Sequence, residues 1–122
     1  MRYALILTIL FLSGFSSFSQ KKELIEDKDL IIQRATVELD SAMAGPAGSI
    51  YLWAQQNPIR GEYIFDISIW EKGTITSVYA VGNNNGTIDS QNRLRSLLMN
   101  FQFNFKMPKG KSYKFRYAFT FN

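Results

Sequence analysis

The stretch SYKFRYAFTF, from Ser112 to Phe121, decides the fold of this chain. Aromatic residues occupy every second position of the stretch: Tyr113, Phe115, Tyr117, Phe119 and Phe121. Successive side chains of a strand point to opposite faces, so this spacing predicts a strand with five aromatics on one face. Burial of five such side chains offers about 8–15 kcal/mol gross, which is large beside the net stability of about 5–15 kcal/mol of a whole domain. We therefore expect this strand to anchor the core, and any function of the strand to lie on its backbone edge and on the Lys114–Arg116 side.

The composition of the 122 residues limits the catalytic and metal-binding chemistry that is possible. Cys and His are both absent. A disulfide, a thiolate nucleophile and a zinc site of ordinary composition are thereby excluded, and the commonest general base is missing. We expect no cofactor, no metal site and no catalytic residue, and therefore a protein that is not an enzyme.

The net charge of +4 is unevenly distributed. Acidic residues outnumber basic ones between positions 21 and 40, whereas the part from Arg93 to the end contains basic residues and no acid. A basic half is compatible with nucleic acid or anionic lipid, but also with a solvated face that keeps a small protein soluble. We prefer the solvated face, and the export signal described next argues against nucleic acid.

The N-terminus has the features of a signal peptide. Arg2 precedes the apolar run Tyr3–Leu12, and small residues stand at Ser17 and Ser19. The apolar run is shorter than the roughly 20 residues of a membrane-spanning helix. We predict a signal peptide over residues 1–19, cleaved between Ser19 and Gln20, with a junction similar to those of the Bacteroidota. The absence of Cys excludes a lipoprotein. The alternative is an uncleaved membrane anchor; cleavage predicts a periplasmic or secreted protein.

Two helical segments are indicated before residue 57. Apolar residues at spacings of three and four predict a helix capped by Asp29 and ended by Gly45 and Pro46. This face comprises Ile31, Ile32, Ala35, Leu39, Ala42 and Met43. The short apolar stretch 50–54 is compatible either with a helical turn and a half capped by Ser49 or with a short strand.

The remainder predicts a hairpin, a helix and the last strand. Residues 62–70 alternate in hydrophobicity, 71–73 form a turn and 74–81 are rich in β-branched residues, which is typical of a β-hairpin. Thr87 or Asp89 is expected to cap a helix with an apolar stripe at Leu94, Leu97, Leu98 and Phe101. Phe103 and Phe105 are expected to lie between the end of this helix and the sheet. One helix can return the chain so that the last strand lies antiparallel beside the first, with Asp66 facing Lys114 and Arg116.

The predicted fold class is α+β: an antiparallel hairpin, a helix and a C-terminal strand forming a three-stranded sheet packed on a helix, with an additional N-terminal helix. The corresponding division is a signal peptide (1–19), an N-terminal helical segment (20–56) and a ββαβ domain (57–122).

The order of these features resembles the TonB C-terminal domain. The resemblance rests on Gly61 before the first strand, the Lys72-Gly73 turn, the helix stripe, the Pro108–Gly110 turn and the alternating last strand. It covers about residues 57–122. Compared with TonB, we expect this chain to lack the membrane anchor and the Pro-rich arm, and Asn57-Pro58 replaces the usual Tyr-Pro pair.

The resemblance implies a transport-related binding module of the periplasm or cell envelope. In that family a receptor peptide adds to the open edge of the last strand, which here corresponds to Tyr113, Lys114, Phe115, Arg116 and Tyr117. The partner would be an envelope protein or receptor peptide, not nucleic acid, and a membrane only if the N-terminal segment is uncleaved; the oligomeric state stays open. The alternative is that this edge binds no partner and that its Lys and Arg only prevent aggregation with other chains.

Two further functional classes are weighed. One is a structural or assembly subunit of an envelope complex that uses exposed Trp53 or Trp70. The other is a hydrolase built on Glu62, Asp66 and Glu71, which we disfavour because carboxylates on a strand opposite Lys and Arg are usually surface charges.

Overall fold

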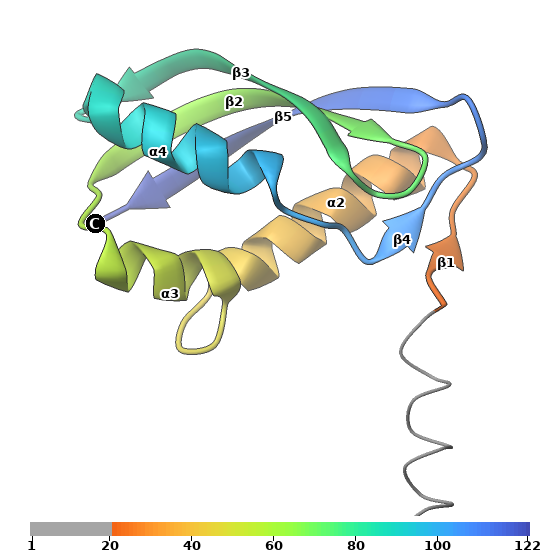
Figure 1. The fold of residues 1–122 in the computed structure, drawn as a ribbon, viewed down its shortest axis with the longest axis horizontal. Helices are drawn as coiled ribbons and strands as arrows, with labels where there is room; N and C mark the ends of the chain where they lie inside the picture. Colours follow the sequence, from red (N-terminus) through yellow and green to blue (C-terminus); the bar gives the residue numbers. More distant parts are fainter. Residues whose placement is uncertain (1–20) are drawn as a thin grey trace, which may run out of the picture.

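The computed structural model describes residues 21–122. The predicted signal peptide, with its cleavage site between Ser19 and Gln20, lies outside the described residues. The described part is an α+β domain in which a three-stranded antiparallel sheet lies over the helices (Figure 1). Its helices are α2 (Lys28–Met43), α3 (Ser49–Gln56) and α4 (Ile88–Met99). Its strands are β1 (Glu23–Leu24), β2 (Gly61–Trp70), β3 (Ile75–Asn84), β4 (Phe105–Lys106) and β5 (Ser112–Phe121).

The sheet has the order β3-β2-β5, as the sequence predicts. Strand β2 pairs antiparallel with both neighbours, and Tyr63 lies opposite Phe119 and Ile67 opposite Phe115. The hairpin turn depends on Gly73, whose φ is 76° and at which an added Cβ would lie 2.4 Å from the carbonyl oxygen of Phe105. A left-handed backbone with so close an approach requires glycine.

The aromatic face of β5 belongs to the core. Phe115 and Phe119 are buried, while Tyr113, Tyr117 and Phe121 are half-buried. The five aromatics share one face as predicted, but their burial differs because β5 is the edge strand of its sheet. They join one hydrophobic cluster that extends from Ile25 through α2, α3 and α4 to this strand. Residues 21–122 therefore hold a closed core of their own.

The N-cap of helix α2 lies two residues before the predicted one. Asp27, not Asp29, is the N-cap residue, and its Oδ2 accepts a hydrogen bond of 3.1 Å from the Leu30 backbone N–H. The prediction of Asp29 was wrong because both acids suit this end of a helix: Asp29 lies in the first turn, where a negative charge is favourable. The helix buries Ile31, Ala35, Leu39 and Ala42.

The short apolar stretch after the Gly-Pro turn is helical. Helix α3 is capped by Gly48 without a side-chain hydrogen bond, so Ser49 is its first residue and not its cap. Helix α4 is capped by Thr87, whose hydroxyl accepts from the Ser90 N–H at 3.1 Å. Of its predicted stripe, Leu94 and Leu98 are fully buried, and Leu97 and Phe101 pack partly buried against them.

A second, two-stranded pairing completes the fold. Strand β1 pairs in parallel with β4, and Leu24 lies opposite Lys106. Two-residue strands have no alternating pattern, so the sequence did not predict them. The adjoining Phe103 and Phe105 are fully buried, with ring centroids 5.5 Å apart, and Phe103 also contacts Phe115 on β5. Phe103 thus lies between Phe101, just after α4, and the sheet, as expected, whereas the Phe105 ring lies beside Arg34 of α2.

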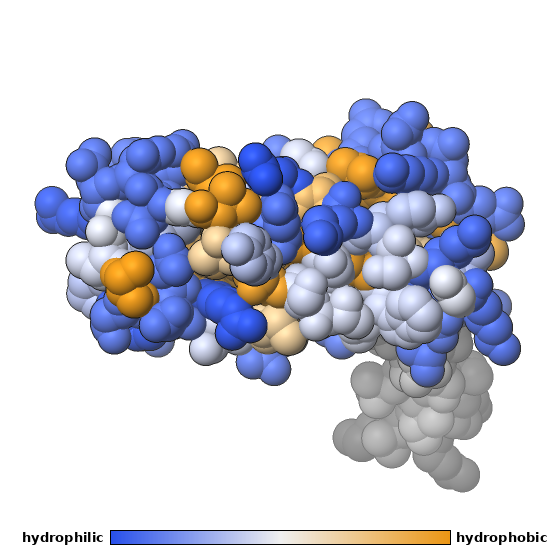
Figure 2. Space-filling model, turned by 90° about the horizontal axis from the view of Figure 1, so that it is seen from above, coloured by the Kyte–Doolittle hydropathy of each residue, from blue (hydrophilic) through white to orange (hydrophobic). Residues whose placement is uncertain are grey.

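The outer face of the sheet is turned away from the helices. Figure 2 shows this face with mostly hydrophilic side chains and hydrophobic ones at several separate places among them. Tyr79 and Val81 on β3 and Trp70 on β2 are the large residues exposed on these strands. Within residues 21–122, no helix combines the length and the apolar character needed to cross a membrane.

Candidate functional site: the outer edge of the last strand

Strand β5 forms one edge of the sheet. Within residues 21–122 it pairs only with β2, along its whole length. Helix α2 meets β5 through inner-face side chains: the Tyr117 hydroxyl donates to Asp40 Oδ1 at 2.5 Å, and Lys28 Nζ lies 6.0 Å from the centroid of the Tyr113 ring. Figure 1 shows α2 beneath the sheet. The N-terminal helix thus packs under the strand, and no described strand occupies its outer edge.

The hairpin turn establishes which peptide groups of β2 point toward β5. The N–H of Trp70 donates to the carbonyl of Thr74 at 2.9 Å, and the Trp70 carbonyl accepts from the Gly73 N–H at 2.8 Å. Both groups of Trp70 therefore point toward β3. In an antiparallel sheet the peptide groups of successive residues point to opposite edges, so those of Ile69 and Ile67 point toward β5.

The register carries this alternation to β5. Ile69 lies opposite Tyr113 and Ile67 opposite Phe115, so these aromatic residues exchange backbone hydrogen bonds with β2. The intervening residues, Lys114, Arg116 and Ala118, direct their N–H and C=O groups to the outer edge. Of the five predicted residues, the two cationic ones thus present peptide groups for pairing. The three aromatic ones, Tyr113, Phe115 and Tyr117, anchor the strand from its inner face.

An ion pair with Asp66 on β2 keeps the Arg116 side chain over the sheet and away from the outer edge of β5. Arg116 Nε lies 2.9 Å from Asp66 Oδ1, and Arg116 Nη2 donates to Oδ2 at 3.3 Å. The hydrogen bond from Arg116 lowers the pKa of Asp66 and raises that of Arg116. The predicted proximity of Asp66 and Arg116 is confirmed. Lys114, which lies opposite Ser68, makes no ion pair within the described residues and remains a cation beside the edge.

The inner flank of the edge has a contact between Tyr117 and Asp40. Burial of the phenol, together with its hydrogen bond to the Asp40 carboxylate, raises the pKa of Tyr117 well above its usual value. Tyr117 therefore stays a neutral donor, and it holds the otherwise exposed Asp40 of α2 next to β5. A carboxylate below the strand and the Lys114 ammonium above it give the edge opposite charges on its two sides.

A hollow of about 470 Å³ lies where the edge ends. It is formed by the end of α2, by α3, by the loop before β2 and by the last residues of the chain. Its lining combines apolar and aromatic side chains with the guanidinium of Arg60. The lining residues are Met43, Tyr51, Ala54, Gln55, Pro58, Ile59, Arg60, Thr120, Phe121 and Asn122. Sequence reasoning missed this hollow because four separate segments build it and none carries a motif.

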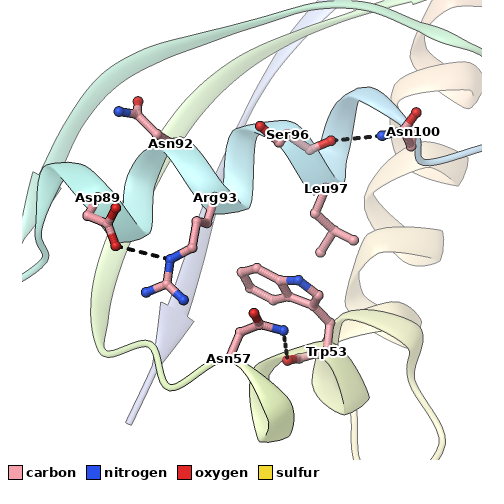
Figure 3. Close-up of a pocket in the computed structure, with 8 residues that line it drawn as sticks. All are labelled: Trp53, Asn57, Asp89, Asn92, Arg93, Ser96, Leu97 and Asn100. Carbon is pink, nitrogen blue, oxygen red and sulfur yellow. Dashed lines mark hydrogen bonds and ion pairs between the residues drawn. The ribbon is translucent and has the colours of Figure 1, made fainter.

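Another hollow, of about 410 Å³, lies between α3 and α4 (Figure 3). Several of its polar groups have local partners: Arg93 forms an ion pair with Asp89, with 3.2 Å between Nε and Oδ2, and Asn57 Nδ2 donates to the Trp53 carbonyl at 3.0 Å. Arg93 Nε is buried without a hydrogen bond among the described residues. The indole of Trp53 points toward Leu97 across the groove. Trp53 is therefore half-buried in a helix–helix contact and does not form an exposed patch.

The carboxylates considered for hydrolysis have separate local partners. Glu62 Oε1 accepts from Asn84 Nδ2 at 2.7 Å, and Glu71 Oε2 accepts from the Gly110 N–H at 2.9 Å. Asp66 is paired with Arg116. Residues 21–122 contain no group of three or more carboxylates arranged to hold a metal ion. These contacts account for each carboxylate as a structural group: Glu62 near the start of β2, Asp66 in the middle of that strand and Glu71 in the hairpin turn.

Comparisons with known proteins give one structural likeness. No family model matches the chain, and no curated protein matches it. A similar solved structure is the solution structure of the TonB C-terminal domain of Helicobacter pylori, residues 179–285. The two are 18% identical, the match covers 79% of this chain and 85% of that one, and the TM-score is 0.45. At this level the likeness does not assign a function, which has to be argued from the geometry of β5.

Proposed function

We propose that this chain is an exported binding module of the cell envelope that captures an extended segment of a partner protein as an additional strand on β5. The observation that carries the proposal is the outer edge of β5, where Lys114, Arg116 and Ala118 present peptide groups and no described strand pairs with them. Unpaired N–H and C=O groups along a strand template an incoming backbone. This is also the binding mode that the resemblance to TonB C-terminal domains implies.

Backbone pairing alone gives little net affinity. About six new hydrogen bonds contribute roughly 3–9 kcal/mol, at about 0.5–1.5 kcal/mol each. Ordering four to six peptide residues costs about 1–2 kcal/mol per residue, which largely offsets this gain. A partner therefore needs a side-chain anchor. The hollow beside Phe121, lined by Tyr51 and Met43, is placed to receive an apolar side chain at the end of the paired segment.

The charges of the edge indicate which peptides fit. Lys and Arg on an edge strand can simply prevent aggregation, but the Arg116 guanidinium is bound to Asp66 and is turned over β2. The Lys114 ammonium has no ion-pair partner among the described residues, so it can attract an acidic side chain on the outer face of an added strand. On the inner side Asp40 favours a basic or hydrogen-bond-donating side chain. We expect a segment with alternating charge and an apolar anchor at one end.

An amide titration tests the proposal. Labelled protein comprising residues 21–122 is titrated with peptides from the plug regions of envelope receptors, and backbone amide shifts are followed by NMR. We expect the largest shifts at Lys114, Arg116 and Ala118, and smaller ones at Tyr113, Phe115 and Tyr117. Unmoved shifts over 113–117 with every peptide would contradict strand addition.

A substitution pair tests the backbone directly. Lys114→Pro removes an outward N–H without removing a hydrogen bond to β2, which an edge strand tolerates. Lys114→Ala removes the same ammonium and keeps the N–H. Strand addition predicts much weaker binding for the proline variant than for the alanine variant. Equal affinity of the two variants would mean that the peptide binds to side chains and does not pair with the backbone of the strand edge.

A role as an assembly subunit is the second candidate, and the outer face of the sheet favours it. Tyr79 is 70% exposed there, and Trp70 and Val81 are 37% and 41% exposed. Large exposed side chains on adjoining strands can mark a protein interface. If Tyr79→Ser abolishes capture of an envelope partner while Lys114→Pro does not, the assembly role replaces strand addition.

A further inference from the structure

Lysines of three chain segments meet at the end of the domain where the described chain begins. A hollow of about 580 Å³ is lined by Lys21, Lys22, Lys72 and Lys106, together with Thr74 and Gln102. The parallel pairing of β1 with β4 brings the first residues of the domain to Lys106. Lys22 Nζ then bridges to the hairpin turn, donating to the Lys72 carbonyl at 3.0 Å and to Gln102 Oε1 at 3.2 Å.

The positive charge of this hollow has no counter-charge in its lining. No carboxylate lines it among the described residues. The acids nearest in sequence have other partners: Glu23 Oε1 lies 3.1 Å from Arg34 Nη1, and Glu71 Oε2 accepts from the Gly110 N–H. Four ammonium groups around one concavity differ from a solvated face of mixed charge. They create a local positive potential that attracts an anionic partner.

Apolar side chains lie between these lysines. A neighbouring hollow of about 350 Å³ is lined by Leu24, Met107 and Pro108 together with Lys72, Lys106 and Lys109, and with Glu71. Leu24 is 48% exposed. We call this surface the lysine end, comprising Lys21, Lys22, Lys72, Lys106, Lys109 and Leu24. Exposed leucine among lysines fits the interface of a bilayer, where apolar groups enter and ammonium groups meet headgroups. Nucleic-acid surfaces favour Arg and aromatic residues, and neither lines these hollows.

The position of the lysine end along the chain also favours a membrane as its partner. The apolar run Tyr3–Leu12, which the sequence predicts to be part of a signal peptide or an uncleaved anchor, precedes Lys21 and Lys22, so this predicted membrane-directed segment joins the domain at this end. We infer that the lysine end docks on the anionic headgroups of a phospholipid membrane, with Leu24 inserted between them. Attraction of this kind increases with each lysine near the surface and is screened over about 10 Å at 0.1 M salt. The inference stands independently of peptide binding at β5.

Vesicle co-sedimentation tests the inference. Residues 21–122, which hold a closed core, are mixed at low salt with phosphatidylcholine vesicles containing or lacking phosphatidylglycerol. We expect binding only to the anionic vesicles, and loss of binding at high salt. The double variant Lys72→Glu/Lys106→Glu should bind at least about tenfold more weakly. Leu24→Ser should weaken binding several-fold without any change of charge, which a purely ionic contact would not show.

A matched double variant controls for net charge. Arg93→Glu/Arg95→Glu on α4 makes the same change of charge away from the lysine end, and it should retain most of the vesicle binding. Circular dichroism verifies that all variants are folded. Equal binding to neutral vesicles would overturn the inference, as would equal losses in the two double variants. Tighter binding of a mixed-sequence oligonucleotide than of anionic vesicles would also overturn it and assign the lysine end to nucleic acid.

Discussion

Arg116 on the edge strand β5 donates two hydrogen bonds, of 2.9 and 3.3 Å, to the carboxylate of Asp66 on the central strand β2. The two residues are directly opposite in the antiparallel register. The pair therefore helps to specify that register, because a slip by one residue would turn the aromatic face of β5 outward. It also keeps the guanidinium over the sheet and away from the outer edge.

The first prediction concerns the pH dependence of this pair. Arg116 lowers the pKa of Asp66 in the folded state, so the pair contributes stability above the ordinary carboxyl pKa of about 4. That contribution is lost as the pH falls through the lower, folded-state pKa. Asp66→Asn should be slightly less stable than wild type at neutral pH, and the difference should vanish in acid, as measured by denaturant unfolding. Arg116→Met and the double variant complete a cycle. Simple additivity of the two single effects would show that the pair is not coupled.

The second prediction concerns Tyr117. Burial and the Asp40 carboxylate raise its pKa, so the stability from this phenol is complete below the ordinary value of about 10. It is lost as the pH rises toward the raised, folded-state pKa. The ultraviolet difference titration between wild type and Tyr117→Phe should show a phenol that ionises later than about pH 10. Asp40→Asn should bring this ionisation to lower pH. A Tyr117 titration unaffected by Asp40→Asn would contradict the contact between α2 and β5.

The third prediction concerns the hairpin turn. Gly73 has a φ of 76°, and its carbonyl accepts from the Phe103 N–H at 2.9 Å. Gly73→Ala should lower the free energy of unfolding by about 1–3 kcal/mol or more, because the backbone is left-handed and the new Cβ meets Phe105. Gly82→Ala is the control, since nothing lies within 4 Å of an added Cβ there. Denaturant unfolding compares them, and equal stability of the two variants would contradict the turn geometry.

The fourth prediction concerns the packing of α4 under the sheet. Leu98 is fully buried, whereas Leu52 on α3 is 49% exposed. Leu98→Ala should cost about 2–5 kcal/mol of the free energy of unfolding. Leu52→Ala should change it by about 0.5 kcal/mol or less. A Leu98→Ala protein as stable as the Leu52→Ala protein would show that α4 does not cover the core.

Long periodic segments were predictable from the sequence, and features built by distant segments were not. The alternation in β2 and β5 and the stripe of α4 each lie within one element, so the three-stranded sheet and the position of α4 could be derived. The cap of α2 was misplaced by two residues because Asp27 and Asp29 have similar chemistry. The pairing of β1 with β4 and the hollow beside Phe121 form only when segments distant in the sequence come together, so no local sequence pattern predicts them.

The edge of β5 was predictable only in part for the same reason. The period of two assigns Tyr113, Phe115 and Tyr117 to the core face, but side-chain pattern carries no information on which peptide groups face outward. That assignment required the hydrogen bonds of Trp70 at the hairpin turn. It divides the predicted residues into anchoring aromatics and edge-presenting Lys114 and Arg116.

Amide hydrogen exchange of β5, residue by residue, tests the central claim most directly. The account predicts an alternation in the free protein: slow exchange at Phe115, Tyr117 and Phe119, which bond to β2, and fast exchange at Lys114, Arg116 and Ala118, which face the outer edge. A bound peptide should slow the fast set and leave the slow set unchanged. Uniformly slow exchange from 114 to 118 in the free protein would show that the edge is already covered and would contradict the account.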